Sequence, residues 1–294
     1  MSLLDPEFFR ALGATCETPD PAHPPLAAAL GLPGQADPAD HTELFVFLLV
    51  PHASVYLGAD GMLGGEAGDR VAGFWRALRL DLPREPDHLA ALLGLYAALG
   101  EHERNEPDPA RALMWRQARR ALLWEHLLSW VPPYAAAVER TGSGFYAAWA
   151  RLLSDALHAE ADALSPPPTP PLHLRDLPDL PAAEEGLGVL VHGLLAPARS
   201  GLILTRSDLA RAARATGLGL RMGERAFMLR AMLDQDAAAT FAWLAVEADR
   251  WAAHHRAAEV TLGAVARHWR TRAEATRYAL TDEPRAAMEV AHAR

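Results

Sequence analysis

The chain has 294 residues, of which 50% are hydrophobic and 22% are charged, so it is long and apolar enough to bury the core of one large domain or two smaller ones. Its formal net charge of -9 disfavours a general affinity for nucleic acid or for anionic membranes. All 28 basic residues are arginine, which excludes lysine chemistry, and the single cysteine, Cys16, excludes an internal disulfide and a four-cysteine metal site.

The start of the chain has no basic region leading into an apolar core, so it does not resemble a secretory signal. The longest apolar run, residues 44–50, ends at Pro51 and is too short to span a bilayer. We therefore expect a soluble, cytoplasmic protein without a membrane span.

Helical spacing of apolar residues recurs along the chain and strict alternation does not, so the sequence predicts an all-α fold. Five glycines within residues 58–68 predict a loop, and a helix follows it. We expect Pro83 and Pro86 to end that helix, because the residue before a proline avoids the helical region. Asp87 is then a favourable N-cap for the next helix.

Two shorter breaks, Glu106–Pro109 and Gly142–Gly144, separate further helices. The strongest break is Ser165–Pro181, which holds seven prolines and two aspartates and is expected to be extended rather than packed. We therefore predict a helical domain over residues 1–164, a proline-rich linker over 165–181 and a second helical region over 182–294.

Three apolar stripes at helical spacing are predicted to face the core rather than a ligand. They comprise Leu123, Leu127 and Trp130; Phe241, Leu244, Ala248 and Trp251; and Leu262, Val265, Trp269 and Thr276.

The sequence contains no clear motif for metal binding, phosphate binding or nucleophilic catalysis. None of the 13 histidines stands in a His-Glu-x-x-His pattern, and the adjacent rings of His254 and His255 would diverge on a helix. The glycine-rich stretch 58–68 lacks the Gly-Lys-Ser/Thr ending of a phosphate loop, and Gly142–Gly144 is too short for a nucleophile elbow. We therefore expect no metal, cofactor or catalytic residue; an enzyme whose site is not visible in the sequence stays an alternative.

Residues 207–228 form the pattern helix, turn at Gly217, helix, which is typical of a DNA-binding helix-turn-helix. Seven arginines against two acidic residues in the region 199–230 could hold phosphates. Gly219 and Gly223 count against this interpretation, because glycine within a recognition helix costs about 1 kcal/mol. A transcriptional regulator is thus the rival hypothesis from a different functional class.

Several short motifs resemble one known family. Glu85–Leu89 reads Glu-Pro-Asp-His-Leu at an expected helix start, and Glu125–Tyr134 reads Glu-His-Leu-Leu-Ser-Trp-Val-Pro-Pro-Tyr near a helix end. Pro51–Leu57 supplies Ser-Val-Tyr-Leu before the glycine-rich loop, and Phe145–Leu153 matches the helix that follows the tryptophan motif. Over about Phe45–Leu153 the chain resembles the TorD/DmsD/NarJ family, the dedicated chaperones of molybdenum-containing oxidoreductases.

The resemblance implies a TorD-like helical bundle, followed here by a second helical region beyond the usual family length. It implies a cytoplasmic chaperone that is not an enzyme and carries no cofactor. Its partner would be the apo catalytic subunit of a molybdopterin-dependent oxidoreductase, bound in many members through a twin-arginine leader peptide and held until the cofactor is inserted. Acidic residues that usually follow the Pro-Asp-His are replaced by Leu92 and Gly94. The identity of the client, the binding of a nucleotide and the oligomeric state stay open.

The expected client-binding residues come from the two principal motifs and from the helix between them. They are Asp87, His88, Tyr96, Glu125, His126, Leu127, Trp130 and Tyr134. The two carboxylates would pair with arginines of the client, and the aromatic and aliphatic members would anchor it, because such residues dominate interface energies. The family pattern also places the two motifs on one face. A helix cap is the alternative role for Asp87, and core packing is the alternative for Trp130.

Overall fold

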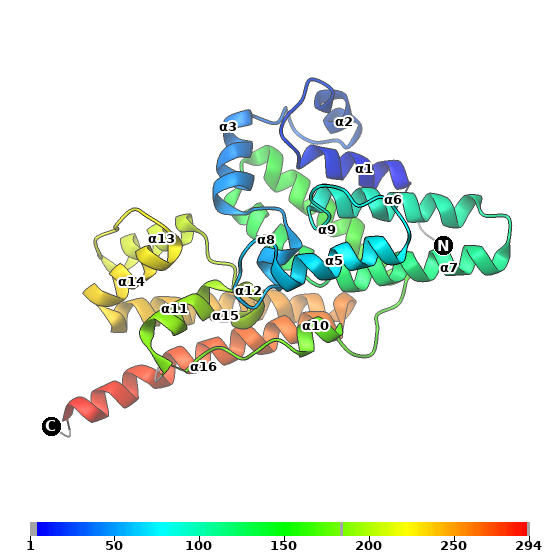
Figure 1. Ribbon diagram of the computed structural model, residues 1–294. Helices are drawn as coiled ribbons and strands as arrows, with labels where there is room; N and C mark the ends of the chain where they lie inside the picture. The colour runs from blue at the N-terminus through cyan, green and yellow to red at the C-terminus, as the bar shows by residue number, and fades with distance from the viewer. Residues whose placement is uncertain (1–4, 183–184, 293–294) are drawn as a thin grey trace. The chain divides into compact units, whose positions relative to one another are not determined.

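The computed structural model describes residues 5–182 and 185–292 (Figure 1). These residues form helices joined by loops, with no β-strand among them, so the all-α prediction is confirmed. The chain divides into two compact units. The first comprises Met1–Leu57 and Leu63–Pro171, and the second comprises Gly58–Met62 and Leu172–Arg294. Within the described residues, every helix is too short or too polar to cross a membrane.

The first unit is a bundle in which α1 packs on α6, α6 pairs with α7, and α8 pairs with α9 (Figure 1). Its helices are α1 (Pro6–Thr15), α2 (His23–Ala29), α3 (Pro38–His41), the π-helical η1 (Thr42–Leu48), α4 (Ala53–Leu57), α5 (Gly65–Ala77), α6 (Leu89–Asn105), α7 (Pro109–Ala121), the π-helical η2 (Leu122–Leu127), α8 (Val131–Thr141) and α9 (Gly144–Ala163). Side-chain caps begin several of them; Asp5 caps α1 and Asp108 caps α7, each followed by a proline suited to the first helical position.

Helices α6, α7 and α9 are joined by a buried ionic cluster. The Arg119 guanidinium on α7 lies 2.8 Å from the Glu160 carboxylate on α9 and 2.9 Å from the Glu103 carboxylate on α6. The hydroxyl of Tyr96 donates to Glu160 and accepts from Arg119. Since the side chains of Arg119 and Glu160 are 4% and 0% exposed, each charge depends on the other for compensation.

The second unit is organised around a long antiparallel helical hairpin, α15 with α16 (Figure 1). Its helices are α10 (Leu172–Arg175), α11 (Leu187–Leu195), α12 (Pro197–Ser200), α13 (Arg206–Thr216), α14 (Arg225–Gln235), α15 (Ala237–Leu262) and α16 (Ala264–His292). All members of the three predicted apolar stripes are buried, which confirms them as core positions.

The structure confirms the breaks at Glu106–Pro109 and Gly142–Gly144 and corrects one helix end. Helix α5 ends at Ala77, well before Pro83, because Arg79 adopts a left-handed conformation with φ 57°. The N–H groups of Leu78 and Arg79 accordingly bond back to carbonyls of the last turn. The proline-rich segment also contains a short helix, α10, so it is not extended throughout.

The helix-turn-helix hypothesis is not supported. Helix α13 ends where predicted, with Gly217 left-handed at φ 72°, but α14 begins only at Arg225. Residues 217–224 form a loop, which is longer than the turn of three or four residues in a DNA-binding helix-turn-helix. Gly219 lies within this loop, where both of its backbone polar groups bond to the side chain of Gln235.

Replacing Glu160 with Leu should lower the free energy of unfolding by about 3–5 kcal/mol, because the Arg119 charge loses its most buried partner. Urea unfolding of the purified variant measures this change. The control is Arg151→Gln, which removes an ion pair with Glu139 at the surface and should cost less than about 1 kcal/mol. Equal effects of the two substitutions would contradict a stabilising role for the buried cluster.

Candidate functional site

A short antiparallel pairing joins two of the sequence motifs. The Ala53 N–H donates to the Asp87 carbonyl at 3.0 Å, and the Leu89 N–H donates to the Pro51 carbonyl at 2.8 Å. His52 and His88 are therefore opposite one another, with ring centroids 4.8 Å apart. The pairing fixes the loop before α6 against the segment that leads into α4.

The sequence predicts that Asp87 caps α6, and this prediction is wrong. The pairing places Asp87 one residue before the cap position. The N-cap is His88, whose Nδ1 accepts from the Ala90 N–H at 3.1 Å. The buried Asp87 carboxylate instead accepts from the Ser54 N–H at 3.0 Å, in the first turn of α4. Asp87 thus satisfies a free donor at the start of a neighbouring helix.

The second motif is folded into the core behind α4. The Trp130 indole N–H donates to the His126 carbonyl at 2.7 Å, and its ring stacks on Tyr56 of α4 at 5.2 Å. The Tyr134 hydroxyl donates to the Leu49 carbonyl at 3.2 Å. Both motifs therefore contact α4 or its flanking residues, one through Asp87 and the other through Trp130.

This packing buries four of the expected client anchors. Tyr96, Leu127, Trp130 and Tyr134 are between 0% and 2% exposed, so they pack in the core of the first unit. The sequence pattern could not separate these roles, because large apolar residues serve both cores and interfaces.

The polar members of the second motif differ in their exposure. His126 is buried with its ring against Phe74, and burial lowers the pKa of its imidazole to about 4. Glu125 is exposed, but partial desolvation by the surrounding residues raises the pKa of its carboxyl. Of Glu125 and His126, only Glu125 has an exposed side chain.

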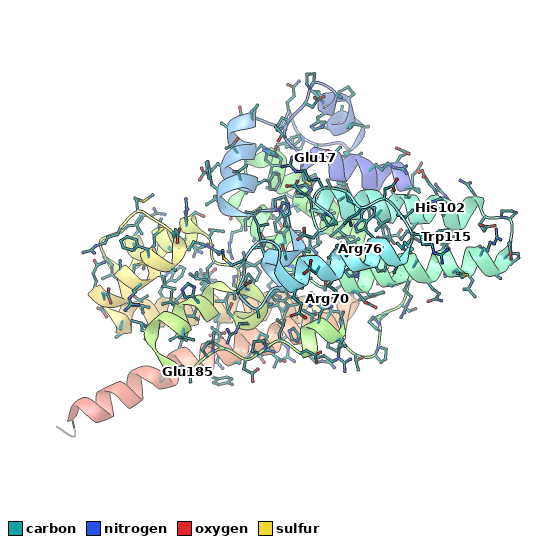
Figure 2. The ribbon with its side chains drawn as sticks, in the orientation of Figure 1. Glu17, Arg70, Arg76, His102, Trp115 and Glu185 are labelled. Atoms are coloured by element: carbon teal, nitrogen blue, oxygen red, sulfur yellow. The ribbon has the colours of Figure 1, made fainter. Side chains whose placement is uncertain are left out.

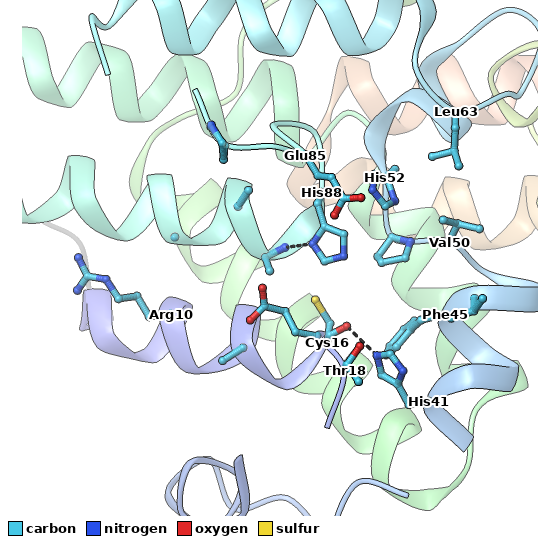
Figure 3. Close-up of a pocket in the computed structure, with 18 residues that line it drawn as sticks. Arg10, Cys16, Thr18, His41, Phe45, Val50, His52, Leu63, Glu85 and His88 are labelled. Atoms are coloured by element: carbon cyan, nitrogen blue, oxygen red, sulfur yellow. Dashed lines mark hydrogen bonds between the residues drawn. The ribbon is translucent and has the colours of Figure 1, made fainter. Parts of the chain in front are cut away.

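A cavity of about 800 Å³ lies next to the histidine pair (Figure 3). Phe45 and Val46 of η1, with Val50 and Leu63, supply apolar lining. Val46 and Leu63 are 55% and 58% exposed, so apolar surface continues from the cavity to its mouth.

Acidic side chains stand at the cavity mouth. Glu17, which follows the end of α1, and Glu85, which precedes the histidine pair, are both exposed (Figures 2 and 3). Across the described residues, neither forms an ion pair. The nearby Arg10 is engaged instead by Glu101 and Glu7. Sequence reasoning did not select Glu17 or Glu85 as site residues, because only the fold brings them to the same cavity.

Two histidines of the cavity, His88 and His41, have lowered pKa values. Burial, followed by the neighbouring His52, lowers the pKa of His88 to about 4. Burial also lowers the pKa of His41, whose Nε2 lies 3.3 Å from the Cys16 carbonyl. A buried Nδ1 of His52 has no hydrogen-bond partner in the described part of the chain. No three His, Cys, Asp or Glu side chains among the described residues are grouped to hold a metal ion.

A second, smaller cavity of about 560 Å³ lies between the end of α5 and α7. Trp115, in its wall, stacks on His102 of the adjacent α6 with centroids 4.7 Å apart (Figure 2). This cavity lacks the motif residues, so the 800 Å³ cavity is the better candidate for the functional site.

Comparison with known families finds a similarity that lies largely within the first unit. Residues 22–136 match the family model described as nitrate reductase delta subunit. Over these residues the chain is similar to the NarJ/TorD-like chaperone family. The matched segment contains the pairing of 51–53 with 87–89, the motif at 125–134 and most of the cavity lining. No curated protein matches the chain. This family consists of molybdoenzyme maturation chaperones and is not a family of catalysts.

The stability of the first unit should fall as the pH decreases from about 6.5 to 4. His88 and His126 have folded pKa values of about 4 against an ordinary 6.5, so only the unfolded chain takes up protons in that window. Each histidine contributes a slope of at most about 1.4 kcal/mol per pH unit, with its full stabilisation present above pH 6.5.

Chemical denaturation at several pH values, with wild type beside His126→Phe, measures this slope. The Phe variant should show the shallower dependence, whatever its stability at pH 8. His192→Gln, at an exposed histidine, should keep the wild-type slope. Parallel curves for all three proteins would show that His126 carries no linkage.

Proposed function

We propose that the first unit binds the apo catalytic subunit of a molybdopterin-dependent oxidoreductase and retains it in the cytoplasm until its cofactor is inserted. The family similarity supports the class of client. The observation that carries the site is the 800 Å³ cavity, which combines an apolar wall with two unpaired carboxylates beside the Glu-Pro-Asp-His-Leu motif.

The chemistry of the cavity fits a twin-arginine leader peptide. Guanidinium groups of the leader would pair with Glu17 and Glu85, since charge-assisted bonds between arginine and carboxylate are short and strong. The apolar run that follows the arginines would lie against Val46 and Leu63. The lowered pKa values of His41 and His88 favour their neutral forms, which add no charge that would repel the leader's arginines.

The motif residues act on binding by position in this proposal. Asp87 holds the loop before α6 against α4, and His88 caps α6. Trp130 and Tyr134 contact α4 and the end of η1 from the core side. Glu125 and His126 lie outside the cavity lining, and Glu125 is a third exposed carboxylate for a larger contact with the apo subunit.

Glu17→Gln and Glu85→Gln should each weaken binding of a leader peptide. The probe is a synthetic peptide with two adjacent arginines followed by an apolar run, titrated calorimetrically into the full-length protein. Each exchange should raise Kd about threefold to fivefold at low salt, which corresponds to about 1 kcal/mol for an exposed ion pair. The effect should shrink at high salt, because exposed charges are screened.

Matched variants separate the cavity from the general surface charge. Glu43→Gln removes an exposed carboxylate of η1 outside the cavity and should leave Kd unchanged. Val46→Asp should raise Kd about tenfold or more, roughly 1.4 kcal/mol, because it places a charge in the apolar wall. Loss of affinity in Glu43→Gln equal to that in Glu85→Gln would reduce the interaction to net charge and contradict the proposed site.

A further inference from the structure

Residues 176–181, here called the strap, are fastened to the second unit by two arginines. Arg272 of α16 donates to the Leu177 carbonyl at 2.7 Å, to the Pro178 carbonyl at 3.0 Å and to the Asp179 carboxylate at 2.6 Å. Arg199 of α12 donates twice to the Asp179 carbonyl, at 3.1 and 2.7 Å. Three consecutive carbonyls are therefore bound by guanidinium groups.

The end of the strap fits a notch at Gly193 of α11. A Cβ atom at Gly193 would lie 2.4 Å from Cδ of Pro181 and 3.2 Å from Cδ1 of Leu180. Any larger residue at position 193 would displace the strap. Pro181 is buried in this notch, so the surface accepts a proline ring at one defined position.

The strap is bound in the way that a peptide ligand is bound. Its carbonyls are held by side chains from distant helices, and the Asp179 side chain is 96% exposed while that of Arg272 is 11% exposed. The groups that hold it thus belong to the folded unit, and the strap supplies mainly backbone. Other proteins also recognise proline-containing segments in an extended conformation. Binding then costs little conformational entropy, because proline already restricts the free peptide.

We propose that Arg199, Arg272 and Gly193 form a binding site for extended, proline-containing peptide segments with an acidic residue, and that the strap is its intramolecular occupant. A partner segment of the same chemistry would replace the strap. Tethering gives the strap an effective concentration on the order of millimolar, so an external segment competes poorly until the strap is weakened or released. The site lies in the second unit and does not depend on the proposed function of the first.

The test uses the full-length protein and a fluorescent peptide that reproduces residues 172–182. In the double variant Asp179→Ala/Pro181→Ala the strap is weakened while the binding surface is unchanged. Fluorescence anisotropy should show that this variant binds the peptide at least tenfold more tightly than wild type. Adding Arg272→Gln should abolish that gain, whereas Arg267→Gln, at an exposed arginine of the same helix, should leave it intact.

Trypsin cleavage after the exposed Arg175 reports strap release and should accelerate in the double variant. Unchanged cleavage, or loss of helical circular dichroism, would show that the strap is an integral part of the unit and would overturn the proposal. Faster cleavage without peptide binding would also overturn it, because the surface would be free yet would not accept the peptide. All of these variants lie outside the first unit, so their failure leaves the leader-peptide test unaffected.

Discussion

The pairing of residues 51–53 with 87–89 is the constraint on which the candidate site depends. It sets His52 opposite His88 and turns the Asp87 carboxylate toward the N–H of Ser54, so the loop before α6 cannot move without exposing buried polar groups. Leaving one such group unsatisfied costs about 1–3 kcal/mol. The Ser54 hydroxyl in turn accepts from the Gly64 N–H, which ties the glycine-rich loop to the same point. These few hydrogen bonds thus fix the shape of the cavity wall.

This arrangement separates the residues that shape the site from those that a client can touch. Trp130 stacks on Tyr56, and Tyr134 holds the Leu49 carbonyl, so the aromatic motif supports α4 and the end of η1 from the interior. In the proposed site, a client would contact exposed side chains, namely the carboxylates of Glu17 and Glu85 and the apolar mouth formed by Val46 and Leu63. A motif can therefore identify a binding family although most of its side chains are buried.

The features that the sequence predicted well are local, and those it missed depend on contacts between distant residues. Apolar periodicity and glycine or proline breaks were enough to predict the helical fold, its buried stripes and several helix ends. The partner of Asp87 is Ser54, 33 positions earlier, so helix-start chemistry alone suggested a cap that His88 provides instead. Composition likewise indicated an extended proline-rich segment, while the arginine that holds it, Arg272, is more than 90 residues away. The spacing of Trp130 could not decide whether its side chain is exposed, because apolar residues at helical spacing occur both in cores and at interfaces.

The two π-helical segments add a reason why the site lies where it does. Each closes with a bond of longer register, from the Leu49 N–H to the Leu44 carbonyl and from the Leu128 N–H to the Leu123 carbonyl, both at 2.7 Å. The extra residue in such a turn shifts the side chains that follow to a new face, a local cost that is frequent at functional sites. Within η1, Val46 is exposed at the cavity mouth and Phe45 is buried. Both residues line the cavity, so this segment of η1 supplies one buried and one exposed side chain to its apolar wall.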